Sequence, residues 1–190
     1  VAYFVKDINS LRTSTVETEP RYDQENDIFV PVASTQPDNG LGGLLDGIEV
    51  GGQHDLGGYG GSVNYTYTSG SADEKRAPSK PGSGLVEGTS TNMFNLTAYY
   101  EDDMFGARLM YNYRSEWYKG LHFNGDELFN DDFGQWDASA AYNFDENITF
   151  TLEAVNITDE EVFEYNVDKA RVMSRYANGR RFVAGVRVNF

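Results

Sequence analysis

The last eleven residues of the chain, RRFVAGVRVNF (180–190), alternate strictly between apolar and polar positions. In an extended chain, alternate side chains point to opposite faces, so this period of two predicts a strand with one apolar face and one polar face. The apolar face carries Phe182, Ala184, Val186, Val188 and Phe190. Such a strand occurs in a membrane β-barrel and also in a soluble sheet. The pattern of the whole chain has to decide between a membrane protein and a soluble one.

The same alternation recurs along the chain and predicts an all-β protein of about eight strands, with no segment typical of a helix. The predicted strands are 1–8, 44–53, 57–69, 92–101, 104–118, 133–144, 147–158 and 180–190.

Two tight turns predict the register of their hairpins. If Asp102 and Asp103 form a two-residue turn, every opposed pair on one face is apolar or aromatic, and Tyr99 lies opposite Gly106. A turn at 145–147 gives the same result for the next hairpin. The first turn predicts the pairs Tyr100–Phe105, Ala98–Ala107, Leu96–Leu109 and Phe94–Tyr111, and the second predicts Phe144–Ile148, Tyr142–Phe150, Ala140–Leu152 and Ala138–Ala154.

The connections alternate between long and short. The long ones are 9–43, 70–91, 119–132 and 159–178, and the short ones are 54–57, 102–103 and 145–147. A transmembrane up-and-down β-barrel has short periplasmic turns and longer extracellular loops, whereas a β-sandwich has no reason for this alternation. The pattern therefore favours a membrane barrel over a soluble lectin-like sandwich.

Aromatic residues make up 14% of the chain and cluster near the ends of the predicted strands. Tyr and Trp concentrate where a membrane protein crosses the interface between lipid and water, so this placement is typical of aromatic girdles. The candidates are Tyr65, Tyr67, Tyr100, Phe105, Tyr111, Tyr113, Trp117, Trp136, Tyr142 and Phe144.

Charge and composition exclude several functions. The net charge of −15 gives no basic patch for nucleic acid, and the absence of cysteine excludes a thiol nucleophile and cysteine-bound zinc. The two histidines, His54 and His122, fall in distant segments, so we expect no catalytic, cofactor or metal site. Asp126, Glu127, Asp131 and Asp132 lack the spacing of a calcium loop and are more simply a solvated acidic loop.

Four charged residues fall on the polar face of their predicted strands: Arg108, Arg114, Glu153 and Arg187. An arginine on the lipid face costs about 2–4 kcal/mol at mid-membrane, so this placement predicts that the polar face lines the lumen. In the same way, we expect Leu96, Leu109, Phe150 and Val186 to face lipid.

Several segments resemble the C-terminal strands of TonB-dependent outer-membrane receptors. The shared elements are NYRS (112–115), DAS (137–139), NITDE (156–160) and the terminal Phe190, with LDGIEVG (45–51) upstream. No one of them is specific alone, but their order and spacing cover nearly all of the 190 residues.

The resemblance implies an integral protein of the Gram-negative outer membrane, with residues 1–190 as roughly the last eight strands of a 22-stranded barrel. The plug domain and the earlier strands of the barrel would lie outside this sequence. The first and last strands of residues 1–190 would pair with strands outside it. The implied function is energised uptake of a scarce, bulky nutrient such as siderophore-iron, cobalamin or an oligosaccharide. The implied partners are membrane lipid, the TonB protein acting through a plug segment, and the barrel-assembly machinery, for which the strand 182–190 would be the recognition signal.

Two alternatives stay open from the sequence. One is a stand-alone eight-stranded barrel with a structural or adhesive role, although its narrow lumen would need larger inward side chains than this chain supplies. The other is the soluble sandwich. The sequence does not identify the substrate.

Overall fold

The structure, a computed structural model, describes residues 1–10, 12–40, 42–72, 86–122 and 126–190. Within these ranges every regular element is a strand. The strands are β1 (Ala2–Ile8), β2 (Arg12–Asp23), β3 (Ile28–Asn39), β4 (Gly43–Asp55), β5 (Tyr59–Ala72), β6 (Asn92–Glu101), β7 (Phe105–Arg114), β8 (Trp117–Leu121), β9 (Glu127–Asn130), β10 (Phe133–Asn143), β11 (Ile148–Val155), β12 (Val162–Asn166), β13 (Asp168–Tyr176) and β14 (Arg181–Val188). The described residues contain no helix long and apolar enough to cross a membrane.

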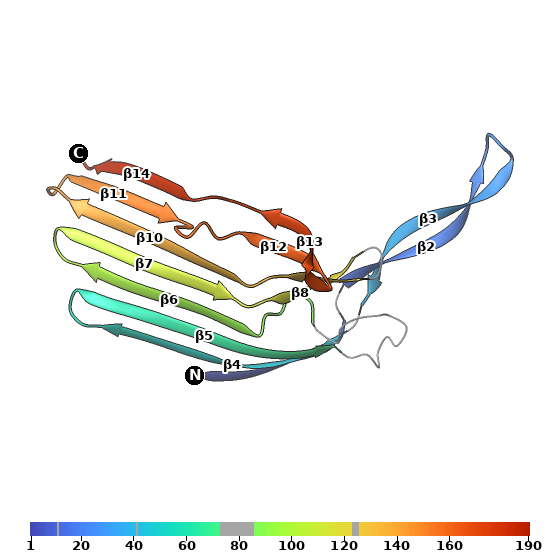
Figure 1. The fold of residues 1–190 in the computed structure, drawn as a ribbon, viewed down its shortest axis with the longest axis horizontal. Coiled ribbons are helices and arrows are strands. Elements are labelled where there is room, and N and C mark those ends of the chain that lie inside the picture. The colour runs from blue at the N-terminus through green and yellow to red at the C-terminus, as the bar shows by residue number, and fades with distance from the viewer. Residues whose placement is uncertain (11, 41, 73–85, 123–125) are drawn as a thin grey trace.

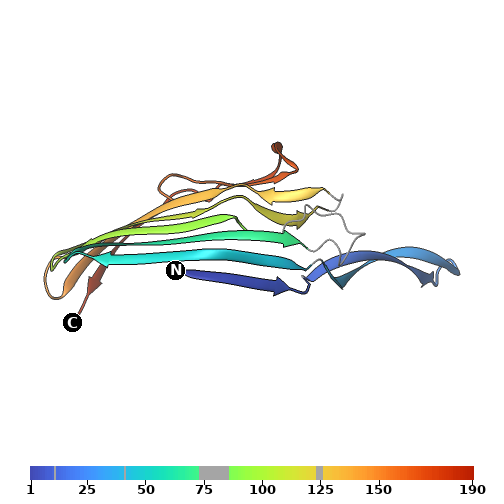
Figure 2. The same ribbon diagram turned by 90° about the horizontal axis from the view of Figure 1, so that it is seen from below.

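Eight of these strands form one antiparallel sheet, which we call the main sheet, in the order β1-β4-β5-β6-β7-β10-β11-β14. They correspond to the eight predicted strands, except that the strand predicted over 104–118 ends at Arg114, and Trp117 and Tyr118 begin β8. Figure 1 shows them side by side, and Figure 2 shows the sheet from another side as a single curved layer. In the described residues no second sheet packs face to face against it, so the sandwich alternative is not supported.

The main sheet is open. Its two edges are β1 and β14, and each of these strands pairs with one neighbour, β4 and β11 respectively. The described residues show no pairing between β1 and β14, so these eight strands do not close a ring by themselves.

Short and long connections lie at opposite ends of the main sheet. The turns after β4, β6 and β10 are at the left of Figure 1, and the long connections are at the right. This arrangement confirms the predicted alternation. We call the end with the long connections the loop end and the other the turn end.

The register of the second predicted hairpin is confirmed, but that of the first is wrong by two residues. Ala138 pairs with Ala154 as expected, whereas Leu96 pairs with Tyr111 instead of Leu109. The cause is Asp102, whose Oδ1 accepts the N–H groups of Met104 (2.8 Å) and Phe105 (2.6 Å) and so builds a four-residue turn. A shift of two residues leaves every side chain on its predicted face.

The corrected register also moves the expected contact between an aromatic ring and a glycine. Tyr99 pairs with Arg108 on one side and with Gly60 on the other. A Cβ at Gly60 would lie 2.2 Å from the Tyr99 hydroxyl oxygen, so the ring covers this glycine and not Gly106. The tyrosine therefore fills space that a larger residue at position 60 would occupy.

The prediction that the long connections are loops is wrong for three of them, because they contain further strands. Residues 119–132 and 159–178 contribute to a four-stranded sheet, here called the loop-end sheet, in the order β13-β12-β9-β8. Within residues 9–43, β2 and β3 form a ribbon that projects beyond the main sheet (Figure 1). The ribbon keeps the register of β1 and β4, since Ile8 pairs with Gly43 and Arg12 pairs with Asn39. Most of the predicted loop 70–91 lies outside the described residues.

The buried side chains gather at the loop end. Val86, Tyr118 and Tyr165 are each less than a tenth exposed. Large apolar side chains of the main sheet are open, among them Leu109 (43% exposed) and Leu152 (52%). A single curved layer has no interior, so the main sheet depends on its surroundings to cover its apolar face.

Candidate functional surfaces

The main sheet has one largely apolar face that runs across all eight strands, with Asp7 and Asp46 as acids on it at β1 and β4. Directly paired residues of an antiparallel sheet share a face, so the registers carry one face from β1 to β14. Leu96, Leu109, Phe150 and Val186 all lie on it, as the sequence predicts. An exposed apolar surface of this extent marks an interaction with a membrane or a protein.

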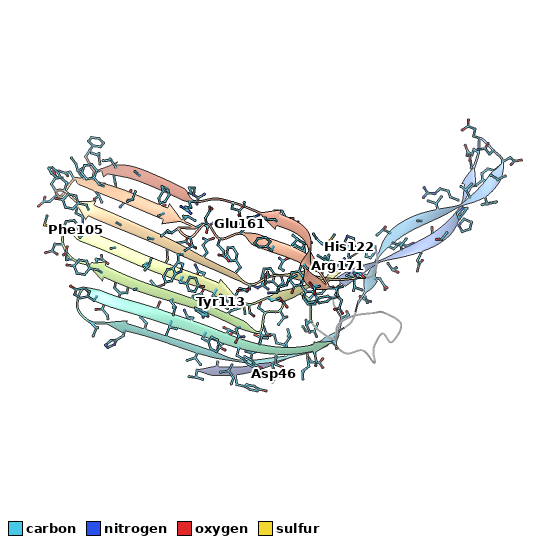
Figure 3. All side chains as sticks on the ribbon, viewed as in Figure 1. Asp46, Phe105, Tyr113, His122, Glu161 and Arg171 are labelled. Carbon is cyan, nitrogen blue, oxygen red and sulfur yellow. The ribbon has the colours of Figure 1, made fainter. Side chains whose placement is uncertain are left out.

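Aromatic rings form two bands on this face, one near each end of the strands. At the turn end, the rings of Tyr59 and Tyr100 are 4.8 Å apart and those of Phe105 and Tyr142 are 4.8 Å apart. At the loop end, Phe94 stacks on Tyr113 at 4.9 Å and Tyr111 stacks on Trp136 at 4.5 Å. Figure 3 labels Phe105 and Tyr113, which lie at opposite ends of β7.

Small and aliphatic side chains fill the strip between the two bands. A shallow depression of about 410 Å³ lies there, lined on the apolar face by Ala98, Ala107, Leu109, Ala138 and Leu152, among others. Phe105 and Tyr113 are eight residues apart along β7, about 27 Å at ~3.4 Å per residue. A strand tilt of ~40° reduces this to a height of about 20 Å, close to the apolar band of an outer-membrane barrel.

The four charged residues predicted for the lumen lie on the opposite, polar face. Arg108 pairs with Ser139 and Glu153 also pairs with Ser139, so the three form one row across β7, β10 and β11. Arg187 pairs with Thr149 on the same face, and Arg114 lies at its loop end. Among the described residues, Arg108, Glu153 and Arg187 form no ion pair with one another. The four charged residues therefore share one face, and it remains a prediction that this face lines a lumen.

The five residues of the predicted assembly signal lie on or just beyond β14. Phe182, Ala184, Val186 and Val188 share the apolar face, since each pairs with a residue of that face on β11. Phe190 follows the end of the strand and is fully exposed. Recognition by the assembly machinery remains a prediction.

Three rings, one from each of β8, β9 and β12, pack together in the loop-end sheet. Phe129 lies between Tyr118 and Tyr165, with its ring centroid 5.6 Å from each of theirs. Burial, followed by the charges of Glu87 and Glu127, raises the pKa of Tyr118 to about 12. Burial also raises the pKa of Tyr165. Both phenols therefore stay neutral at physiological pH.

Cations on β13 bind acids in the connections next to the other strands of the loop-end sheet. Lys169 binds Asp131 and lies 3.5 Å from Glu116, Arg171 lies 3.2 Å from Asp126, and Arg175 binds Glu161. Sequence reasoning placed Asp126 and Asp131 in a solvated loop, whereas the structure gives both a cationic partner. The described residues contain no cluster of three or more His, Asp or Glu side chains arranged to hold a metal.

Hydrogen bonds of Asn156 join the motifs DAS (137–139) and NITDE (156–160) at the bend after β11, which we call the elbow. Asn156 is 4% exposed and has a positive φ of 58°. Its N–H donates to Asp137 Oδ1 (2.9 Å), its Oδ1 accepts the N–H of Glu160 (2.7 Å), and its Nδ2 donates to the carbonyl oxygens of Glu160 (3.0 Å) and Gly179 (3.3 Å). Asn156 thus directs the chain from β11 into the loop-end sheet.

The two histidines lie toward opposite ends of the main sheet. His54 is in the last turn-end residues of β4, and His122 lies between β8 and β9 at the loop end, where its N–H donates to the carbonyl of Asp126 (2.8 Å). Figure 3 labels His122 beside Arg171. The structure therefore does not bring the histidines into one site.

Comparison with known proteins identifies one family. A model described as "TonB dependent receptor-like, beta-barrel" matches residues 1–157, which include the main sheet up to the end of β11. No curated protein and no solved structure matches the chain. The match covers well over half of the sequence, so the chain belongs to the β-barrel family of the TonB-dependent receptors, which are proteins of the outer membrane.

Proposed function

We propose that the main sheet is part of the wall of an outer-membrane transport barrel, with its apolar face against lipid and its polar face toward the lumen. The observation that carries this proposal is the apolar face with an aromatic band near each end. Membrane barrels have an outward apolar band flanked by aromatic girdles and a polar interior. Family membership supports the same setting.

The orientation follows from the two ends. Short turns at one end and long, structured connections at the other correspond to the periplasmic and extracellular sides of a membrane barrel. The loop-end sheet and the β2–β3 ribbon then stand outside the membrane, where a water-soluble ligand would first arrive.

The cargo we propose is a bulky, scarce nutrient, and the energy comes from the TonB protein acting through a plug domain. Siderophore-iron, cobalamin and an oligosaccharide are the candidate classes. The wall performs no covalent chemistry in this proposal, because its polar face serves passage and plug contact.

The two open edges support a wider barrel. In the membrane, unpaired backbone N–H and C=O groups cost several kcal/mol each, so β1 and β14 each need a further strand on their free side. We propose that other strands of the barrel supply it, and that the assembly machinery reads the β14 strand with Phe190.

Cysteine labelling tests the face assignment. In the full-length receptor in its own membrane, single cysteines at Leu109 and Arg108 are exposed to a membrane-impermeant, water-soluble maleimide. We expect labelling at position 108 and protection at position 109. Equal labelling of these adjacent positions in folded protein contradicts the assignment, and Leu152 with Glu153 provides a second pair on β11.

A further inference from the structure

The segment Val86–Thr91, just before β6, is bound into the sheet although it lies outside any strand. The Thr68 N–H donates to the Thr91 carbonyl (2.9 Å), and the Gly88 N–H donates to the Tyr118 carbonyl (2.8 Å). Ser90 forms a β-bridge with Trp117 and is completely buried. The segment therefore connects β5 with β8 at the loop end.

Arg114, at the end of β7, holds this segment through its side chain. Its Nε donates to Ser90 Oγ (2.7 Å), and its Nη2 donates to the Gly88 carbonyl. The guanidinium also lies over the ring of Trp117, 3.8 Å from the centroid. One side chain thus contacts two positions of the segment and the strand to which the segment pairs.

These acceptors are neutral. Among the described residues no carboxylate pairs with Arg114, although the chain has twice as many acidic as basic residues. Hydrogen bonds with a charged partner are stronger than neutral ones, and a guanidinium presents its donors in a rigid fork. The placement fits a residue that positions a backbone segment and does not fit an ordinary ion pair.

Val86, at the N-terminal end of the segment, is held by apolar packing. It is 4% exposed, and a Cβ at Gly70 would lie 3.6 Å from a Val86 methyl group and 2.7 Å from a methyl group of Leu45. The glycine therefore leaves space for the Leu45 side chain, and Val86 packs beside them at an ordinary contact distance. Gly70 pairs with Leu45, and Thr68 with Gly47, so Val86 lies beside the loop end of β4 and β5.

We infer that Arg114 is the positioning residue that keeps Val86–Thr91 folded onto the loop end of the wall. The segment has apolar anchorage at Val86 and hydrogen-bonded anchorage at Ser90 and Gly88. Without Arg114, the second anchor loses both of its side-chain donors, and the segment swings away from Trp117. Access to the polar face at this corner of the loop end then increases.

The test measures access to Val86. The full-length receptor carrying Val86→Cys as its single cysteine is placed in lipid nanodiscs, where both ends are open to solvent, and reacted with a maleimide. Addition of Arg114→Ala is expected to raise the labelling rate by more than about tenfold, because the variant loses two hydrogen bonds to a charged group and each alone corresponds to at least about that factor. Arg114→Lys, which lacks the fork, gives an intermediate rate.

Two controls make the result specific. Arg108→Ala removes an arginine from the same face of the same strand but touches nothing in the segment, and it is expected to leave the cysteine at position 86 protected. A single cysteine introduced by Leu152→Cys reports on the main sheet. Equal labelling at position 86 with and without Arg114, or a parallel rise at position 152, overturns the inference. The readout does not involve transport, so it is independent of the proposed cargo.

Discussion

The main sheet and the loop-end sheet are built from different strands of the same chain, and they are stabilised in opposite ways. Strands of the main sheet have 7 to 14 residues and leave one apolar face open. Strands of the loop-end sheet have 4 to 9 residues, bury Tyr118 and Tyr165, and are tied by ion pairs from β13.

In the proposed setting, the difference follows from the lipid around the main sheet and the water around the loop-end sheet. Lipid covers an apolar face at no cost, so a membrane sheet needs little more than alternation and backbone pairing. Outside the lipid, a small sheet in water has to bury its own rings and pair its own charges, because short strands alone are only marginally stable. In this proposal, membrane and water therefore select different sequence patterns within one chain.

The largest expected effect is the loss of a ring from the loop-end sheet. Tyr165→Ala removes a side chain that is 5% exposed and stacks on Phe129, and burial losses of this kind cost about 3–5 kcal/mol. We expect the amides of β12 to lose protection in hydrogen exchange while those of β11 keep theirs. Tyr142→Ala in the main sheet is the matched control, because lipid fills the space that its ring leaves. Equal losses in both sheets contradict the comparison.

The second largest expected effect is a loss of stability when a charge is placed on the apolar face of the main sheet. Leu109→Arg places a charge on the apolar face between the two aromatic bands, where it is expected to cost about 2–4 kcal/mol. Thr97→Arg puts the same side chain on the polar face of the neighbouring strand. The free energy of unfolding, measured in lipid vesicles with a denaturant, should fall for the first variant and change little for the second. A similar loss in both variants means that the two faces are not distinguished by lipid.

The sequence predicted the main sheet well because its signal is periodic. The eight strands, their order, the register at Ala138–Ala154 and the shared polar face of Arg108, Arg114, Glu153 and Arg187 follow from alternation and turn positions. The register at Leu96 was missed because one side chain, Asp102, decides how many residues the turn takes. Alternation is the same before and after a shift of two, so it cannot detect such a shift.

The loop-end sheet was missed for a different reason. Its strands are short, and residues such as Asp126, Glu127 and Asp131 are typical of a polar loop. Their partners on β13 lie far along the chain, and no local pattern indicates them. Arg114 was singled out as a charge on the polar face, but its contacts with Ser90 and Gly88 depend on the folding of a segment that has no periodic pattern.

The elbow between the two sheets should show a smaller effect. Asn156→Ala removes hydrogen bonds to Glu160 and Gly179 and leaves a residue with a Cβ at a positive φ, so we expect a loss of about 1–3 kcal/mol at this junction. Asn156→Gly accepts the backbone angle but still lacks the amide. The rate of protease cleavage near residues 156–161 should rise in the order wild type, glycine variant, alanine variant. No rise in either variant shows that the amide does not hold the elbow.

The smallest expected effect is a change in the pKa of Glu161. Its measurement tests whether the ion pair between Arg175 of β13 and Glu161 forms in solution. The Arg175 guanidinium donates to the Glu161 carboxylate and lowers its pKa. Because the folded pKa lies below the ordinary value of about 4.3, the contribution to stability is present above that value and is lost as the pH falls through the lowered one. Carbon-13 NMR of a labelled Glu161 carboxyl should give a midpoint below the ordinary value, and Arg175→Ala should return it toward that value. Arg171→Ala removes the neighbouring cation, which binds Asp126, and should leave the midpoint of Glu161 unchanged. If Arg175→Ala leaves the midpoint in place, the Arg175–Glu161 pair is absent in water, and β13 is held in the loop-end sheet by its backbone pairing with β12 and its other ion pairs.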